Sequence, residues 1–473
     1  MLRPRWRKVL RDVWLHKART LLVVLAIAMG IIGAGSVLNT WAMVRRVTRE
    51  GFMATNPASA TIRTDAIDSA LLARVEAVPG VAIAEARRTV IGSIMAQGGW
   101  RTAVLFSLAD FTAVEIGRLK PESGAWPPAD GAITIERSSV EFAAIGVGDA
   151  AAVQIGTAPP VALAVSGIAR DAGLAPGWME HIVYGFVTPA TLTRLGAPAT
   201  FDQLQIVVED RSLDREAVRR IAFDVKAVVE ATGRRVADVD VPEPGRHIHA
   251  GQIDSLLYTQ GAFGVLALLL SGFLVINLIT AMLAGQVREI GVMKTIGAQS
   301  GQLARMYLGL ALVLGLVASL IALPTAAVIG RWYAQFTADL LNFDTAGFGI
   351  PRWAFGVELA AGALLPLVAA SIPVVRGCRI SVSDALRDVG IDGGGVAPAW
   401  VQRVSGLTRP LLLSLRNAFR RRQRMALTLI TLATAGAVYL GALNLRASIQ
   451  RSVGVQFDVI RYDIAIQIGR AHV

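Results

Sequence analysis

The sequence is short of cysteine, lysine and charge as a whole. Its single cysteine, Cys378, excludes an internal disulfide. Five lysines occur among 473 residues, and none completes the Gly-Lys-Ser/Thr sequence with which a P-loop binds phosphate. Charged residues make up 17% of the chain, against about 25% in soluble domains. This composition argues against a soluble globular protein. We also expect no enzyme, because any energy from ATP has to come from another chain.

Apolar residues are abundant, and the charge is unevenly placed. Hydrophobic residues make up 53% of the sequence and the mean hydropathy is +0.52, which indicates a membrane protein. The net charge is +12, yet residues 45–254 contain 21 basic and 25 acidic residues. The basic excess therefore lies in short segments beside apolar runs, where it sets membrane topology. We expect a lipid bilayer and no nucleic acid among the partners.

Five apolar runs are long enough to cross a bilayer, which takes about 20 residues. We expect spans at residues 21–44, 256–283, 306–329, 355–375 and 425–445. Residues 1–20 are basic with apolar side chains at helical spacing, which predicts an amphipathic helix on the cytosolic surface. A cleaved signal peptide is the alternative for the first run, but the run is long for one and no clear cleavage site follows. The basic start places the N-terminus in the cytosol.

The long segment 45–254 cannot span a membrane and predicts a mixed α/β domain outside it. Near its two ends the same order of strand, helix and strand recurs, at 59–64, 68–78 and 81–88 and again at 204–209, 214–232 and 236–241. The second helix is predicted to open at Ser212. Residues 100–187 combine short strands with Gly/Pro turns. We therefore expect an outer domain in two parts.

A short basic turn, QVREIGVMKTIGAQSGQLARMYLG (286–309), joins the second and third runs. Ile290, Met293 and Ile296 recur every third residue, which predicts a short amphipathic helix. Gly297 is placed to end this helix and Ser300 to begin the next. An ordinary positive loop would explain the charges but neither the paired glycines nor the capped helix. We interpret 286–305 as a rigid turn that transmits force into both flanking spans.

After the fourth span the chain repeats its own beginning. Residues 376–414 form a basic, glycine-rich linker that we place in the cytosol. Residues 415–424 are similar to the basic stretch before the first span, and 446–467 would start a second outer domain. The last residues, 468–473, resemble the translation of a sequencing adapter. We expect a polytopic α-helical membrane protein with a mixed α/β extracytoplasmic domain and an internal parallel repeat, in the form of a C-terminally truncated fragment.

One span, a large outer domain, three further spans and the REIGVMKTIGA turn resemble the FtsX-like, MacB-type permeases of ABC transporters, in their long two-repeat form. The resemblance covers nearly the whole chain. It is most specific in the turn, which matches the family at Arg288, Glu289, Ile290, Gly291, Met293, Lys294, Ile296, Gly297 and Ala298. It implies that these residues dock on a separate cytosolic ATPase dimer that binds the ATP and magnesium, so that this chain holds no cofactor.

The resemblance further implies a bacterial inner (plasma) membrane, with the large domain on the periplasmic side. There the permease would act on a lipid, lipoprotein, peptide or drug, with a possible periplasmic accessory protein. Force would pass through the spans, a transfer called mechanotransmission. A signalling or scaffold protein that controls a periplasmic partner is an alternative with the same architecture. A secondary transporter is less favoured, because it would need ionisable residues in its spans, where only Glu358 occurs, near an end.

Candidate sites elsewhere in the sequence are weak. His247 and His249 lack a nearby third metal ligand. Acidic residues at strand–helix junctions are usually solvated, and no nucleophile-elbow sequence supports a serine nucleophile; the residues weighed are Asp202, Glu209, Asp210, Asp214, Ser138, Ser139 and His181. We therefore expect no catalytic residue and no metal site.

Overall fold

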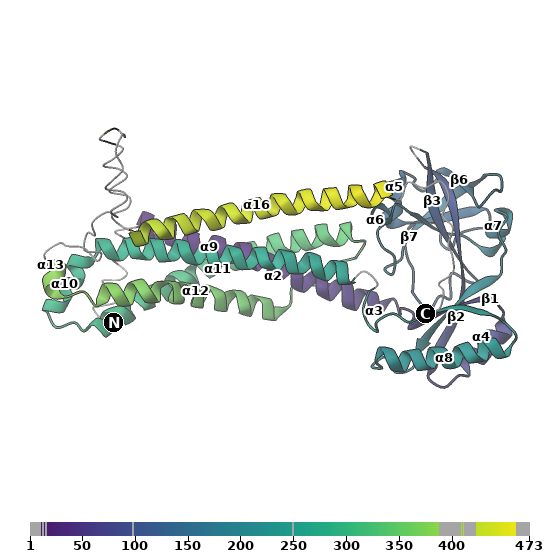
Figure 1. The fold of residues 1–473 in the computed structure, drawn as a ribbon, viewed down its shortest axis with the longest axis horizontal. Coiled ribbons are helices and arrows are strands. Elements are labelled where there is room, and N and C mark those ends of the chain that lie inside the picture. The colour runs from purple at the N-terminus through teal and green to yellow at the C-terminus, as the bar shows by residue number, and fades with distance from the viewer. Residues whose placement is uncertain are drawn as a thin grey trace. The chain divides into compact units, whose positions relative to one another are not determined.

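The computed structural model describes residues 17–96, 99–247, 250–386 and 422–459, together with Arg11, Trp14, Thr408 and Pro410. These residues fall into two units, which are drawn in Figure 1. One unit contains the apolar helices, and the other contains the outer domain together with residues 331–350. The predicted strand at the start of a second outer domain and the adapter-like end lie outside the described residues, as do most of the N-terminal helix and the linker.

Five helices in the described part of the chain are long and apolar enough to cross a membrane. They are α2 (Lys17–Arg46), α9 (Ala250–Gly285), α11 (Ser300–Leu340), α12 (Arg352–Cys378) and α16 (Arg422–Val459). The π-turn η1 (Val47–Gly51) and α3 (Phe52–Ala54) continue α2. Two short helices, α10 (Val287–Thr295) and α13 (Val382–Leu386), belong to the same unit as the apolar bundle. The predicted polytopic helical class is confirmed.

Small residues let the apolar helices approach closely. A Cβ built on Gly30 of α2 would lie 2.2 Å from the Ser271 Cβ of α9, and the Ser271 hydroxyl donates to the Ala26 carbonyl at 2.8 Å. A Cβ built on Gly315 of α11 would lie 2.2 Å from the carbonyl oxygen of Gly362 in α12. Glycine at such crossings is typical of packed membrane helices. The bundle therefore depends on backbone contact that a larger side chain would prevent.

The outer domain is built on one ten-stranded sheet. Its strands are β1 (Ala60–Ile67), β2 (Val81–Ala96), β3 (Gly99–Leu108), β4 (Lys120–Gly124), β5 (Ala132–Glu136), β6 (Ala150–Gln154), β7 (Val161–Arg170), β8 (Val183–Phe186), β9 (Phe201–Val208) and β10 (Val236–Asp240). They pair in the order β10-β1-β9-β2-β3-β8-β5-β7-β4, and β6 pairs with β2 and β7. The predicted mixed α/β class is confirmed.

Two large hydrophobic cores and a smaller cluster around Phe111 and Phe186 lie on this sheet, and the two large cores match the expected two parts. One core joins β1, β2 and β9 to α4 (Ser69–Glu76) and α8 (Arg215–Ala231). The other joins the middle strands to α5 (Arg137–Ala143) and α7 (Pro189–Arg194), and α6 (Gly177–Glu180) follows β7. Strand β2 runs on to Ala96 and pairs with β3 from Arg87 opposite Leu108 to Ala96 opposite Gly99. This long hairpin connects both parts.

The predicted helix range 214–232 agrees with α8 and its two caps, but the expected role of Ser212 in opening this helix is wrong. Asp214 is the N-cap, and its carboxylate accepts a hydrogen bond from the Ala217 backbone N–H at 2.8 Å. Ser212 instead donates from its backbone N–H and its hydroxyl to the Asp210 carboxylate. Both residue types cap helices well, so the choice depends on which one has the free N–H groups of the first turn in reach.

Candidate functional site

The predicted coupling turn contains the short helix α10. Val287, Ile290 and Gly291 form its buried face, and Ile290 is fully buried in the core of the apolar bundle. The Ile290 backbone N–H donates to the Gln286 carbonyl at 3.0 Å, which closes the first turn. Apolar residues at i, i+3 and i+4 bury one side of a helix. The amphipathic helix expected from the sequence is therefore present.

The expected position of Ile296 on the buried face is wrong. Its side chain is 81% exposed, whereas Met293 is half-buried. A helix turns about 100° per residue, so that six residues after Ile290 the side chain points about 120° away from it. In addition, α10 ends at Thr295. Residues that recur at every third position therefore no longer lie on the buried face after two turns.

The end of α10 is a Schellman motif. Gly297 has φ +96°, and its N–H donates to the Lys294 carbonyl at 3.0 Å. The Ala298 N–H donates to the Met293 carbonyl, also at 3.0 Å. This pair of bonds satisfies the last carbonyls of a helix and needs a residue with positive φ between them. Helix α11 begins at Ser300, so both predicted helix boundaries are confirmed.

A second segment of the chain packs against α10, and this contact could not be predicted from the sequence. A Cβ built on Gly291 would lie 2.7 Å from the Ala385 Cβ of α13, so only glycine permits this approach. The Lys294 ammonium donates to the Ile380 carbonyl at 2.7 Å, in the segment between α12 and α13. Gly291 and Lys294 thus have structural roles. The fixed position of α10 depends on the chain that follows α12.

The remaining side of α10 is exposed and mixes charge with apolar surface. Arg288, Glu289 and Thr295 are exposed, and Val292 and Ile296 are 49% and 81% exposed. Exposed aliphatic side chains beside charged ones are suited to contact with another protein. Of the predicted site residues, the structure therefore places Arg288, Glu289 and Ile296 on this exposed face, and Ile290, Gly291 and Lys294 in contact with the chain's own helices.

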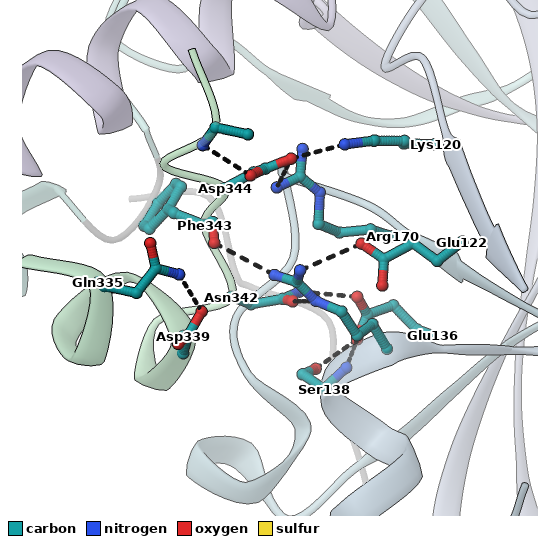
Figure 2. A network of polar contacts seen from close by, with 12 residues as sticks. Lys120, Glu122, Glu136, Ser138, Arg170, Gln335, Asp339, Asn342, Phe343 and Asp344 are labelled. Carbon is teal, nitrogen blue, oxygen red and sulfur yellow. Dashed lines mark hydrogen bonds and ion pairs between the residues drawn. The ribbon is translucent and has the colours of Figure 1, made fainter. Parts of the chain in front are cut away.

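A second polar site lies within the outer-domain unit, around Asn342 (Figure 2). The Asn342 amide donates to the Glu136 carboxylate at 2.7 Å, and its side-chain oxygen accepts from Arg137 Nε at 2.9 Å. Arg137 also donates to Glu122 at 3.1 Å and to the Phe343 carbonyl at 3.3 Å. Asn342 has φ +62°, a conformation that asparagine tolerates better than most residues. This network joins the loop after α11 to the start of α5.

The pKa values of the two acids in this network, Glu136 and Asp344, are shifted in opposite directions. Glu136 is fully buried, and this burial raises the pKa of its carboxyl against the hydrogen bonds from Ser138 and Asn342. Asp344 accepts from Lys120 at 2.6 Å and lies 3.8 Å from Arg170. The hydrogen bond from Lys120 holds the pKa of Asp344 below its usual range. This network could not be predicted from the sequence, because partners about 200 residues away leave no local signal.

The weaker candidates have structural roles. His247 is buried, contacts the Ala172 carbonyl at 2.9 Å and packs between Phe52 and Phe343, while His249 lies outside the described residues. Asp202 pairs with Arg88 at 2.7 Å. In the part of the chain that the structure describes, no group of three His, Cys, Asp or Glu residues could hold a metal ion.

Residues 261–382 match the family model of the FtsX-like permease C-terminal domain. The match runs from α9 through α10 and α11 to the start of α13, and so contains the whole coupling turn. A comparison with curated proteins finds no significant match.

Two solved structures are similar to this chain. The extracellular domain of the noncanonic ABC-type transporter YknZ from Gram-positive bacteria is 11% identical with a TM-score of 0.27, and the match covers 38% of this chain and 100% of that one. The periplasmic region of MacB from Actinobacillus actinomycetemcomitans is 8% identical with a TM-score of 0.27, over 44% of this chain and 95% of that one. Residues 261–382 of this multi-pass membrane protein are thus similar to the C-terminal domain of FtsX-like permeases.

Proposed function

We propose that the chain is the permease subunit of an ABC transporter, in which α10 docks on a separate cytosolic ATPase. The observation that carries this proposal is the exposed face of α10, which lies within the matched family segment. The buried side of the same helix is held by Ile290, by Gly291 against Ala385 and by Lys294 on the Ile380 carbonyl. A helix fixed in this way can pass on a push, whereas a flexible loop would absorb it.

The continuity of α11 supports the transmission of force from α10 along this helix. The Schellman turn at Gly297 leads directly into this helix, which runs unbroken from Ser300 to Leu340 with Pro324 inside it. The residues from Arg331 onwards belong to the outer-domain unit, where Asn342 is bonded to Glu136. A displacement of α10 would therefore be passed to the outer-domain unit through one continuous helix, α11. Such a transfer of force is mechanotransmission.

Several finer points belong to the same proposal. ATP and magnesium would bind to the ATPase dimer, and this chain would carry no cofactor and catalyse no reaction. Arg288 and Lys294 in the turn, with Arg376 and Arg379 at the end of α12, favour a cytosolic side for α10 and a periplasmic or extracellular side for the sheet domain. The membrane would be a bacterial inner membrane. The substrate would be a lipid, lipoprotein, peptide or drug engaged on the outer side.

The test is purification of the full chain from native membranes, with identification of the co-purified proteins. We expect a stoichiometric ATPase, lost on charge reversal by Glu289→Lys because the exposed carboxylate lies on the docking face. Glu141→Lys, at an exposed position of the outer domain, is the matched control and should keep the ATPase bound. Absence of any ATPase from the wild-type preparation would contradict the proposal. Recovery of a periplasmic enzyme in its place would favour the signalling or scaffold alternative.

A further inference from the structure

Helix α12 contains a carboxyl group that the bundle covers almost completely. Glu358 lies near the start of the helix, where the sequence suggested a position at the membrane edge, but its side chain is 2% exposed. Neither carboxyl oxygen has a protein hydrogen bond of ordinary geometry, and among the described residues Glu358 forms no ion pair. Buried carboxyl groups are normally paired or hydrogen-bonded, so this one requires an explanation.

Two neighbouring helices enclose the carboxyl group. A Cβ built on Gly35 of α2 would lie 2.8 Å from Glu358 Oε1 and 3.1 Å from the Ala326 Cβ of α11. The Asn39 side chain of α2 is fully buried and faces the carboxyl group. A Cβ built on Gly330 of α11 would lie 2.6 Å from the Asn39 Cβ, so α11 covers this amide as well. Glycine at both crossings leaves no space for another side chain.

Among the residues that the structure describes, no positively charged side chain is found beside the Glu358 carboxyl group. The groups that face it are Gly35 and Asn39 from α2, with Ala326 of α11 close to Gly35, and none of them titrates. The nearest charged residues along the three packed helices are Arg45 on α2, Arg331 on α11 and Arg352 on α12 itself, and all three are exposed. An unpaired charge inside a protein costs several kcal/mol, and acidic residues inside membrane helices normally face a partner or water. Ionised Glu358 would have neither in this packing.

A protonated carboxyl group fits the same surroundings. It is neutral, its hydroxyl can donate to the Asn39 side-chain oxygen, and its carbonyl oxygen can accept from the Asn39 amide. We propose that Glu358, enclosed by α2, α11 and α12 and facing Asn39, is a proton-binding site that is occupied at neutral pH while the three helices are packed together. Separation of α2 from α12 admits water and releases the proton. Movements of the bundle are therefore linked to proton release and uptake, whatever drives them.

This site does not depend on the proposed ATPase, and its test needs none. The experiment is infrared spectroscopy of the full chain in lipid nanodiscs at pH 7, as a difference between wild type and Glu358→Gln. We expect the wild type to show a protonated-carboxyl C=O band that the variant lacks. An ordinary glutamate, with a pKa of about 4.3, would be protonated in about one molecule in 500 at this pH. Glu141→Gln, at an exposed position, should change no such band.

A second measurement covers the case in which the variant folds poorly. Because the packed bundle holds the proton and an opened bundle releases it, raising the pH above neutral should favour opening in the wild type. The measurement is thermal unfolding of the full chain in nanodiscs from pH 6 to 9. We expect the Glu358→Gln variant to lose part of the wild-type pH dependence. The proposal would be overturned if the wild type and Glu358→Gln had the same infrared bands or the same dependence of stability on pH. It would also be overturned if the stability of the wild type depended on sodium or potassium concentration instead of pH.

Discussion

Removing the Asn342 side chain should release the loop after α11 from the outer domain. Asn342→Ala deletes two hydrogen bonds to charged groups, one to Glu136 and one from Arg137. Each such bond contributes about 1.5–3 kcal/mol, and the φ of +62° adds about 1 kcal/mol of strain for alanine. The ion pairs of Asp344 remain and keep part of the loop attached. Taking the lower limit for the two hydrogen bonds, we expect the loop to lose at least about 3 kcal/mol of local stability.

The assay is hydrogen–deuterium exchange of the full chain in nanodiscs. A loss of about 3 kcal/mol corresponds to about a hundredfold faster exchange for the amides of residues 341–346. Asn342→Gly is the matched variant, because it deletes the same hydrogen bonds without the backbone strain and should exchange more slowly than Asn342→Ala. Amides of α8 serve as an internal control. A loop that stays as protected in both variants as in the wild type would refute the role assigned to this network.

Three further predictions concern the coupling turn and the outer network. Gly291→Ala should lower the free energy of unfolding of the purified chain by about 1–3 kcal/mol, as measured by thermal unfolding, because its Cβ would lie 2.7 Å from α13. Gly301→Ala, which has open space around it, is the control and should be neutral or stabilising. Gly297→Val should lower the free energy of unfolding by about 1–2 kcal/mol, because valine is strained at φ +96°. It should also lower the coupling of ATP hydrolysis to activity while insertion into the membrane stays intact. Unchanged coupling would contradict the role of the Gly297 turn in transmitting force. Asp344 has a lowered pKa, so its contribution is present above about pH 4 and is lost as the pH falls through the folded-state value. Lys120→Met should reduce this acid-dependent loss, by at most about 1 kcal/mol for so exposed a pair, and an unchanged acid profile would contradict it.

Features that depend on neighbouring residues were predictable from the sequence. The Schellman end of α10 follows from Gly297 and Ala298, and the strands and helices at both ends of the outer domain follow from their own periodicity. The choice between Ser212 and Asp214 as a cap already needed the position of the helix.

Features that depend on distant residues were not predictable. The sequence matched Gly291 to the family's turn but did not reveal its partner Ala385, because the two positions are separated by α11 and α12. Asn342 resembles an ordinary turn residue, and its buried partner Glu136 lies 206 positions earlier. The sequence showed only that Glu358 lies near the end of an apolar run. Its burial depends on glycines in two other helices, which the sequence of α12 does not show.

The contact between α10 and an ATPase is tested most directly by crosslinking. A photoreactive residue replaces Ile296, which is 81% exposed on α10, or Ile91, which is 70% exposed on β2 of the outer domain, and native membranes are irradiated. The account predicts a crosslink to a cytosolic ATPase from position 296 and none from position 91. A co-purified ATPase that crosslinks equally from both positions, or from neither, would contradict the docking site placed on α10.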